Sequence, residues 1–231
     1  ILSLFLFSSC STLYKPNAVF SPLLKEKGEG IAGGVVGASG SGTYNFQSAY
    51  AVTNHLAFTA EGMIHSRNYS VNTIDVEKLR IYSGHLGAGY FTTMNEMKSA
   101  VFQVYGGLGS GYARDRIYSN SYSDPIAYSH YLNYFITPGV GYVHEKFELG
   151  FDVRLNYVHM YGLNATLADQ FDWWNTEFNY YNNRSIDFML VEPDLTIKFG
   201  GRRVKGLLDM GLIIPAVNSH EYLMVNGSPL L

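Results

Sequence analysis

Hydrophobic and polar residues alternate along most of the chain with a period of two. The clearest example is residues 146–160. There the odd positions from Phe147 to Tyr157 are apolar, and the even positions include Glu148, Asp152 and Arg154. No stretch shows a convincing apolar period of 3.6 residues. Because successive side chains of a strand point to opposite faces, each alternating segment predicts a β-strand with one apolar and one polar face.

The alternation predicts strands in the following ranges, and a further strand begins near 222: 30–39, 43–52, 55–66, 80–92, 99–113, 131–144, 146–160, 187–199 and 203–213. The connections are short near 53–54, 93–98, 145 and 200–202, and mostly long near 67–79, 114–130, 161–186 and 214–221. Short turns at one end and long loops at the other are typical of transmembrane β-barrels. The predicted fold is therefore all-β, a transmembrane antiparallel β-barrel of about ten strands, with eight as the alternative.

A soluble lipocalin-like barrel also alternates, with its apolar face turned inward. The predicted strands run to about 10–14 residues, longer than the typical soluble strand and long enough for a tilted membrane strand. Aromatic residues recur toward the strand ends, as expected of interfacial girdles: Tyr82, Tyr90, Phe91, Tyr112, Tyr131, Tyr142, Tyr157 and Tyr161. We therefore expect a membrane barrel whose polar faces line the lumen.

In this orientation a set of acidic and basic side chains faces the lumen: Glu61, Glu148, Asp152, Arg154, Glu192, Asp194, Lys198, Arg203, Lys205 and Asp209. Such charges are costly in lipid, but they can form ion pairs inside a barrel. Two roles remain open for this lumen charge network. The pairs either fill and stiffen a narrow barrel or line an ion-selective path.

Composition narrows the classes of protein. The formal net charge is −3 and 15% of residues are charged, against about 25% in an ordinary soluble domain. A near balance of charge argues against a nucleic-acid partner. One cysteine excludes a disulfide scaffold and a clustered thiolate metal site. The apolar runs are shorter than the roughly 20 residues of a membrane-spanning helix.

The first ten residues, Ile-Leu-Ser-Leu-Phe-Leu-Phe-Ser-Ser-Cys, resemble the end of a bacterial lipoprotein signal peptide. This resemblance implies that residues 1–9 are a partial, cleaved signal peptide and that Cys10 is the lipid attachment site. Phe7 departs from the usual aliphatic residue, and a short buried strand is the alternative. We expect residues 10–29 to form a lipidated, extended periplasmic tether. Residues 30–231 then form the barrel, whose last strand is truncated.

The search for reaction chemistry gives little. None of the seven histidines has helical metal-ligand spacing, so no metal site and no cofactor are predicted. His130, with Ser129 and Asp124, is the best candidate for a Ser/His/acid site, although polar neighbours are ordinary in a loop. The Gly33–Gly42 run lacks the lysine and the helix of a phosphate loop. We predict no catalytic residues.

The segment from Gly162 to Ser185 contains both tryptophans of the chain among other aromatic residues: Phe171, Trp173, Trp174, Phe178, Tyr180 and Tyr181. Exposed aromatic side chains are unfavourable unless they pack on the barrel or meet a partner. Self-packing and contact with a protein or glycan therefore both remain open for this partner-contact loop.

Several segments together point to a family: Tyr14–Asn17, Pro22–Glu29, Gln47–His55, Tyr105–Gly109, Tyr134–Tyr142 and Leu190–Pro193. In this order they resemble small outer-membrane β-barrel lipoproteins of Bacteroidota. The resemblance implies an outer-membrane location, contact with outer-membrane lipid and an N-terminal lipid anchor in the periplasmic leaflet. It implies no known reaction.

We therefore expect a non-enzymatic outer-membrane β-barrel lipoprotein that is structural or accessory within a larger outer-membrane protein complex. The alternative is a small, porin-like channel for ions or small solutes. An outer-membrane enzyme ranks third, because no convergent catalytic triad is found.

Overall fold

The computed structural model describes residues 13–37, 42–70, 76–118, 126–166, 185–201 and 203–217. All of its regular secondary structure is antiparallel β-strand, which confirms the all-β prediction. The strands are β1 (Gly30–Val36), β2 (Gly42–Ala51), β3 (Leu56–Ser70), β4 (Val76–Thr93), β5 (Ala100–Tyr118), β6 (Ile126–Val143), β7 (Phe147–Thr166), β8 (Ile186–Gly200), β9 (Lys205–Gly211) and β10 (Ile214–Val217).

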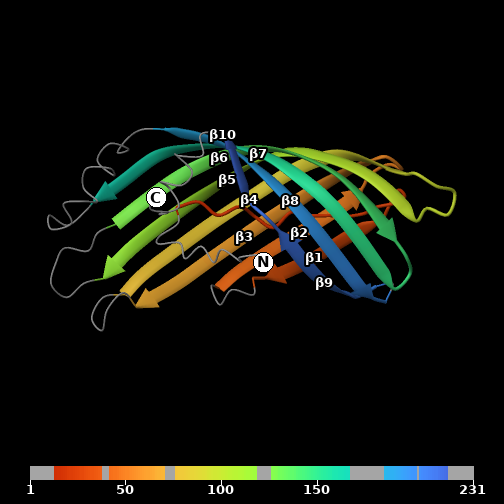
Figure 1. Cartoon of the computed structure of the whole chain (residues 1–231), viewed down its shortest axis with the longest axis horizontal. Coiled ribbons are helices and arrows are strands. Elements are labelled where there is room, and N and C mark those ends of the chain that lie inside the picture. The colour runs from red at the N-terminus through yellow and green to blue at the C-terminus, as the bar shows by residue number, and fades with distance from the viewer. Residues whose placement is uncertain are drawn as a thin grey trace, which may run out of the picture.

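Each strand from β1 to β8 pairs with the next one along the chain, and β9 and β10 both pair with β8. The tilted sheet curls into a nearly closed barrel (Figure 1). Within the described ranges no ladder joins β1 to β9 or β10. The strand expected near residue 222 lies outside those ranges.

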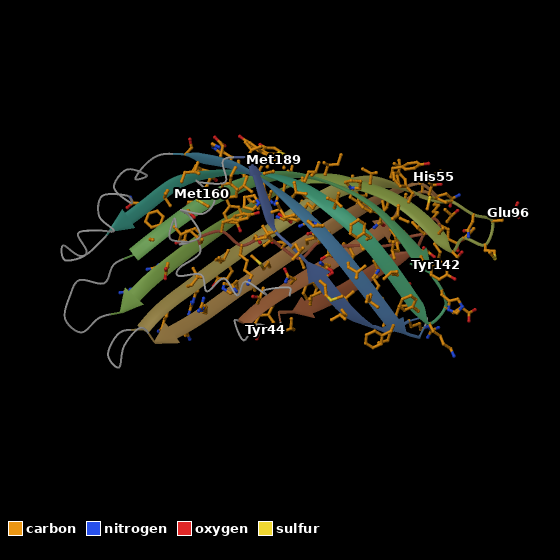
Figure 2. The ribbon with its side chains drawn as sticks, in the orientation of Figure 1. Tyr44, His55, Glu96, Tyr142, Met160 and Met189 are labelled. Atoms are coloured by element: carbon orange, nitrogen blue, oxygen red, sulfur yellow. The ribbon has the colours of Figure 1, made fainter. Side chains whose placement is uncertain are left out.

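The strand boundaries follow the predicted ones closely at one end of the barrel. Residues 52–55, 94–99, 144–146 and 201–204 connect successive strands there, and we call this the short-turn end. Glu96, His55 and Tyr142 lie toward it, and Met160 lies toward the opposite, long-loop end (Figure 2). At the long-loop end several strands extend beyond the predicted ranges. For example, β5 continues through Arg114-Asp-Arg116, where consecutive charges interrupt the alternating pattern.

The two faces of the barrel wall differ sharply in polarity. On β7 the even positions from Glu148 to Met160 are buried, and the odd positions point outward. The outward face is apolar all around the sheet. Its exposed side chains include Phe46, Phe58, Ile64, Leu86, Leu108, Ile136, Phe151, Phe199, Leu208 and Met210. This is the orientation that the sequence pattern predicts.

Residues 13–25 form no strand and run through the interior of the barrel (Figure 1, red). We call this stretch the N-terminal plug. Leu13 and Tyr14 belong to one apolar cluster inside the wall, and Phe20 and Leu24 belong to another. The sequence predicts an extended segment here but carries no pattern that places it inside the barrel.

Candidate functional site in the barrel lumen

Arg154 of β7 makes the central set of polar contacts in the lumen. Its side chain is 1% exposed, and its Nη2 donates hydrogen bonds of 2.9 and 3.1 Å to the carboxylate of Glu61 on β3. Nη1 lies 4.0 Å from a carboxylate oxygen of Glu192 on β8. The guanidinium also lies over the ring of Phe135, 5.1 Å from its centroid. One cation thus joins β7 to three other strands of the wall and offsets two buried carboxylates.

The same guanidinium binds the N-terminal plug. Nη1 donates to the carbonyl oxygen of Asn17 at 3.3 Å, and Nη2 lies 3.5 Å from that of Ala18. On the opposite wall, Gln47 Nε2 donates to the Ala18 carbonyl at 3.2 Å. Asn45 Oδ1 accepts from the Ala18 amide at 3.2 Å. Side chains of the barrel therefore pair the backbone groups that an extended segment leaves open.

Lys198 of β8 makes a second anchor for the plug. Its Nζ donates to the carbonyl oxygen of Ser21 at 2.6 Å and to that of Pro22 at 3.3 Å. Glu148 of β7 lies 3.3 Å from this ammonium group and also pairs with Lys205 of β9. These predicted lumen charges therefore do not pair only with one another, because Lys198 also binds the main chain of the plug.

Gln103 of β5 makes a third anchor. Its Oε1 accepts from the Leu23 amide at 3.1 Å, and its Nε2 donates to Ser21 Oγ at 3.0 Å. Nε2 also donates to Asp152 Oδ1 at 2.8 Å, and Asp152 is fully buried. A neutral amide therefore links the plug to one of the predicted lumen charges.

Tyr14 holds the end of the plug that leads toward the N-terminus. Its ring packs edge-on against Tyr131 at 5.0 Å and Phe188 at 5.3 Å between centroids. Asn156 Nδ2 donates to the Tyr14 hydroxyl and to Glu192 Oε1, at 3.0 Å each. The polar centre of the lumen is therefore closed on this side by an aromatic cluster.

Two glycines leave space on the inner face of the wall where the plug passes. Gly141 of β6 and Gly150 of β7 are register partners. A Cβ on Gly150 would collide with Ser21, and a Cβ on Gly141 would collide with Leu23. A side chain at either position would require the plug to shift away from the wall.

The plug leads into β1 across the short-turn end. Lys98, in the turn between β4 and β5, pairs with Glu26 at 2.9 Å in an exposed position. The hydrogen bond to Glu26 and the charge of that carboxylate raise the pKa of Lys98. Glu29 accepts a hydrogen bond from the Lys25 amide at 2.6 Å. An exposed pair of this kind adds little stability, but it marks the position of the segment.

The remaining predicted lumen charges lie near the short-turn end. Thr196 Oγ1 donates to Asp194 Oδ2 and to Asp209 Oδ1, each at 3.1 Å, so these two acids share one hydroxyl. Arg203 is exposed beside the turn that follows β8, outside the buried network.

Neutral polar side chains complete the lumen, and they are not among the residues expected from the sequence. Asn133 pairs with His85 Nε2 at 2.8 Å, and His85 Nδ1 lies 3.4 Å from Glu61. His85, Asn133, Gln103 and Asn156 all occupy inward positions of alternating strands. Their inward positions in the alternating pattern are the signal that points to them. The expected lumen residues were all charged, so these neutral side chains were not among them.

The candidate Ser/His pair is not assembled. Ser129 is buried and faces the plug, whereas the next residue, His130, is exposed between Tyr112 and Tyr161. Neighbouring residues on a strand point to opposite faces, so the hydroxyl and the imidazole cannot meet. Asp124 lies outside the described residues.

Two other predicted sites also fall outside the described residues. They are the lipid attachment site Cys10 and the partner-contact loop, that is Phe171, Trp173, Trp174, Phe178, Tyr180 and Tyr181.

A cavity of about 1420 Å³ lies near the short-turn end, beside the plug. It is bordered by residues of both β1 and β9, and its lining includes Ile31, Lys98, Glu148, Lys198, Lys205 and Asp209. The two strand edges without a mutual ladder thus face one cavity, whose lining combines charged and apolar side chains.

Among the described residues, no three His, Cys, Asp or Glu side chains are grouped to hold a metal ion. These residues also contain no helix that is long and apolar enough to cross a bilayer. Comparison with known proteins finds no matching family model, no matching curated protein and no matching solved structure.

A disulfide tests whether the plug occupies the lumen. We expect Ser21→Cys with Gly150→Cys to cross-link on mild oxidation. A Cβ on Gly150 would lie 3.0 Å from Ser21 Cβ, so a shift of the plug by roughly 0.5–1 Å brings the pair to the separation of about 3.5–4.5 Å that a disulfide requires. Non-reducing electrophoresis after proteolysis detects the link. Ser21→Cys with Phe151→Cys is the matched control, since Phe151 points outward. Equal cross-linking of the two pairs, or none in the Gly150 pair, contradicts the placement.

A second variant tests the central cation. We expect Arg154→Met to lower the free energy of unfolding by about 3–5 kcal/mol, because Glu61 and Glu192 lose their buried counterion. Urea titration in detergent micelles, followed by electrophoretic mobility, measures the loss. Arg203→Met removes an exposed guanidinium and is expected to change stability by less than about 0.5 kcal/mol. An Arg154 variant as stable as the Arg203 variant contradicts the assignment.

Proposed function

We propose that this chain is an outer-membrane β-barrel lipoprotein whose lumen is filled by its own N-terminal plug. It acts as a non-enzymatic structural or accessory component of a larger outer-membrane protein complex. The barrel fold and the placement of the plug support this proposal, and one observation carries it. That observation is the reversal of polarity between the two faces of the wall.

The reversal is large at the middle of the barrel. Leu86 and Leu108 are cross-strand partners on the outward face, and they are 66% and 59% exposed. Asp152 and Arg154 on the inward face are almost fully buried. A barrel in water hides its apolar face, because burial of apolar surface drives folding. A barrel in lipid shows the opposite arrangement, which is the one found here.

Several exposed tyrosines add to this argument because they lie toward the ends of the strands. Tyr50, Tyr90 and Tyr142 lie near the short-turn end, and Tyr82 and Tyr161 lie toward the long-loop end, whereas Tyr134 and Tyr157 are exposed near the middle of their strands. Tyrosine favours the boundary between lipid and water, where its ring is in an apolar layer and its hydroxyl is hydrated. Of the aromatic residues expected at the girdles, Phe91 and Tyr131 are instead buried inside the wall.

The plug favours a structural role over a channel. Apolar clusters surround the plug at Tyr14 and at Phe20. Its backbone is bound to Arg154 between these two residues, and to Lys198 and Gln103 just after Phe20. A conducting path would require this bound segment to leave the lumen. The lumen charge network thus supports a filled barrel better than a path for ions.

A lipid-facing substitution tests the membrane assignment. We expect Leu108→Arg to lower the free energy of unfolding in phospholipid vesicles by about 2–4 kcal/mol, the cost of arginine near the bilayer midplane. Met97→Arg is the control, because Met97 lies in an exposed turn. In a water-soluble barrel both variants would leave stability nearly unchanged, and that result contradicts the proposal.

The native mass of the full chain tests the accessory role. After extraction from outer membranes in mild detergent, we expect an assembly larger than one barrel that contains a constant second protein. Size-exclusion chromatography with mass spectrometry of the peak measures this. A barrel that migrates alone contradicts the accessory role and leaves the membrane assignment standing.

A further inference from the structure

The N-terminal plug has a direction, and we infer from it that the chain enters the lumen at the long-loop end, at Leu13, and leaves it at the short-turn end. Chain connectivity then joins the residues immediately before Leu13 to the long-loop end rather than to the short-turn end. The inference rests on the proposed function only where an end of the barrel is equated with one side of a membrane.

The C-terminal end of the plug is fixed at the short-turn end. The Lys27 amide donates to Asn54 Oδ1 at 3.0 Å, and the Gly28 amide donates to the Ala51 carbonyl at 2.9 Å. Ala51 ends β2, and Asn54 lies in the turn that follows it. The chain therefore leaves the lumen and enters β1 beside these turns.

The middle of the plug contacts successively deeper positions of the wall. Ser21 binds Lys198, which is two residues from the end of β8. Asn17 binds Arg154, which is seven residues from the start of β7, and also contacts Ser83 in the interior of β4. Moving from Ser21 back to Asn17 is therefore a movement away from the short turns.

The N-terminal end of the plug reaches the opposite end of the wall. Tyr14 packs on Phe188, two residues after the start of β8, and on Tyr131 near the start of β6. The Leu13 carbonyl lies 3.5 Å from Ser129 Oγ, and Leu13 shares a cluster with Leu163 near the end of β7. β6 and β8 begin at the long-loop end, and β7 ends there.

Chain reach then excludes a return to the short turns by the residues just upstream. The stretch from Leu13 to Leu24 can span at most about 36 Å, which is enough to cross the roughly 30 Å hydrocarbon core of a bilayer. Cys10 is three residues before Leu13, so it lies within about 11 Å of Leu13. A lipid on Cys10 would accordingly enter the leaflet at the long-loop end. If the long loops face the cell exterior, this differs from the periplasmic leaflet expected from the sequence.

Thiol labelling of the full chain in sealed outer-membrane vesicles tests the inference. Three single substitutions report the three positions: Thr12→Cys upstream of the plug, Asn72→Cys in the connection after β3, and Met97→Cys in a short turn. The unsubstituted chain measures the background from Cys10. A membrane-impermeant maleimide is applied before and after the vesicles are opened, and a heat-dependent gel shift confirms that each variant is folded.

We expect Thr12→Cys and Asn72→Cys to react with the maleimide in the same state of the vesicles, either sealed or opened. We expect Met97→Cys to react only in the other state, so that one end of the barrel is labelled before opening and the other end is not. Labelling of Thr12→Cys together with Met97→Cys overturns the inference and leaves the membrane barrel intact. Equal labelling of Asn72→Cys and Met97→Cys before opening overturns the membrane barrel itself. The two failures are therefore distinguishable.

Discussion

An extended peptide inside a barrel has no neighbouring strand to pair its amides and carbonyls, so side chains of the wall must do so. In this protein Asn45, Gln47, Gln103, Arg154 and Lys198 perform that task from four different strands. The inner face must be polar where it binds the backbone of the plug, and it is apolar where it packs against Tyr14 and Phe20. The outer face has no plug to bind and carries exposed apolar side chains.

The lumen charges are easier to understand in this light. A buried ion pair gains little net stability, because removing both charges from water offsets their attraction. Arg154 and Lys198 each neutralise wall carboxylates and also donate to carbonyl oxygens of the plug. Their burial is therefore accompanied by hydrogen bonds that two apolar side chains could not supply, since the plug's carbonyls would remain unpaired.

The strands and their faces could be predicted because alternation is local, and each segment of the wall reports its own orientation. The position of the plug could not be predicted, because it depends on distant strands. One signal was present. Leu13, Tyr14, Val19, Phe20 and Leu24 make residues 13–25 more apolar than a solvated tether needs to be. The candidate Ser129–His130 pair shows the converse error, because proximity in sequence places the two side chains on opposite faces of β6.

A barrel that encloses a segment of its own chain constrains the order in which the parts assemble. If the amino end bears acyl chains, it cannot pass through a closed ring lined by buried charges. The strands must instead wrap around a segment that is already laid out, and the ring must close last. The edges of β1 and β9, which share no ladder in the described part of the chain, lie where such a closure would occur. The plug, which is synthesised before the strands of the wall, would then be the template around which the wall is built.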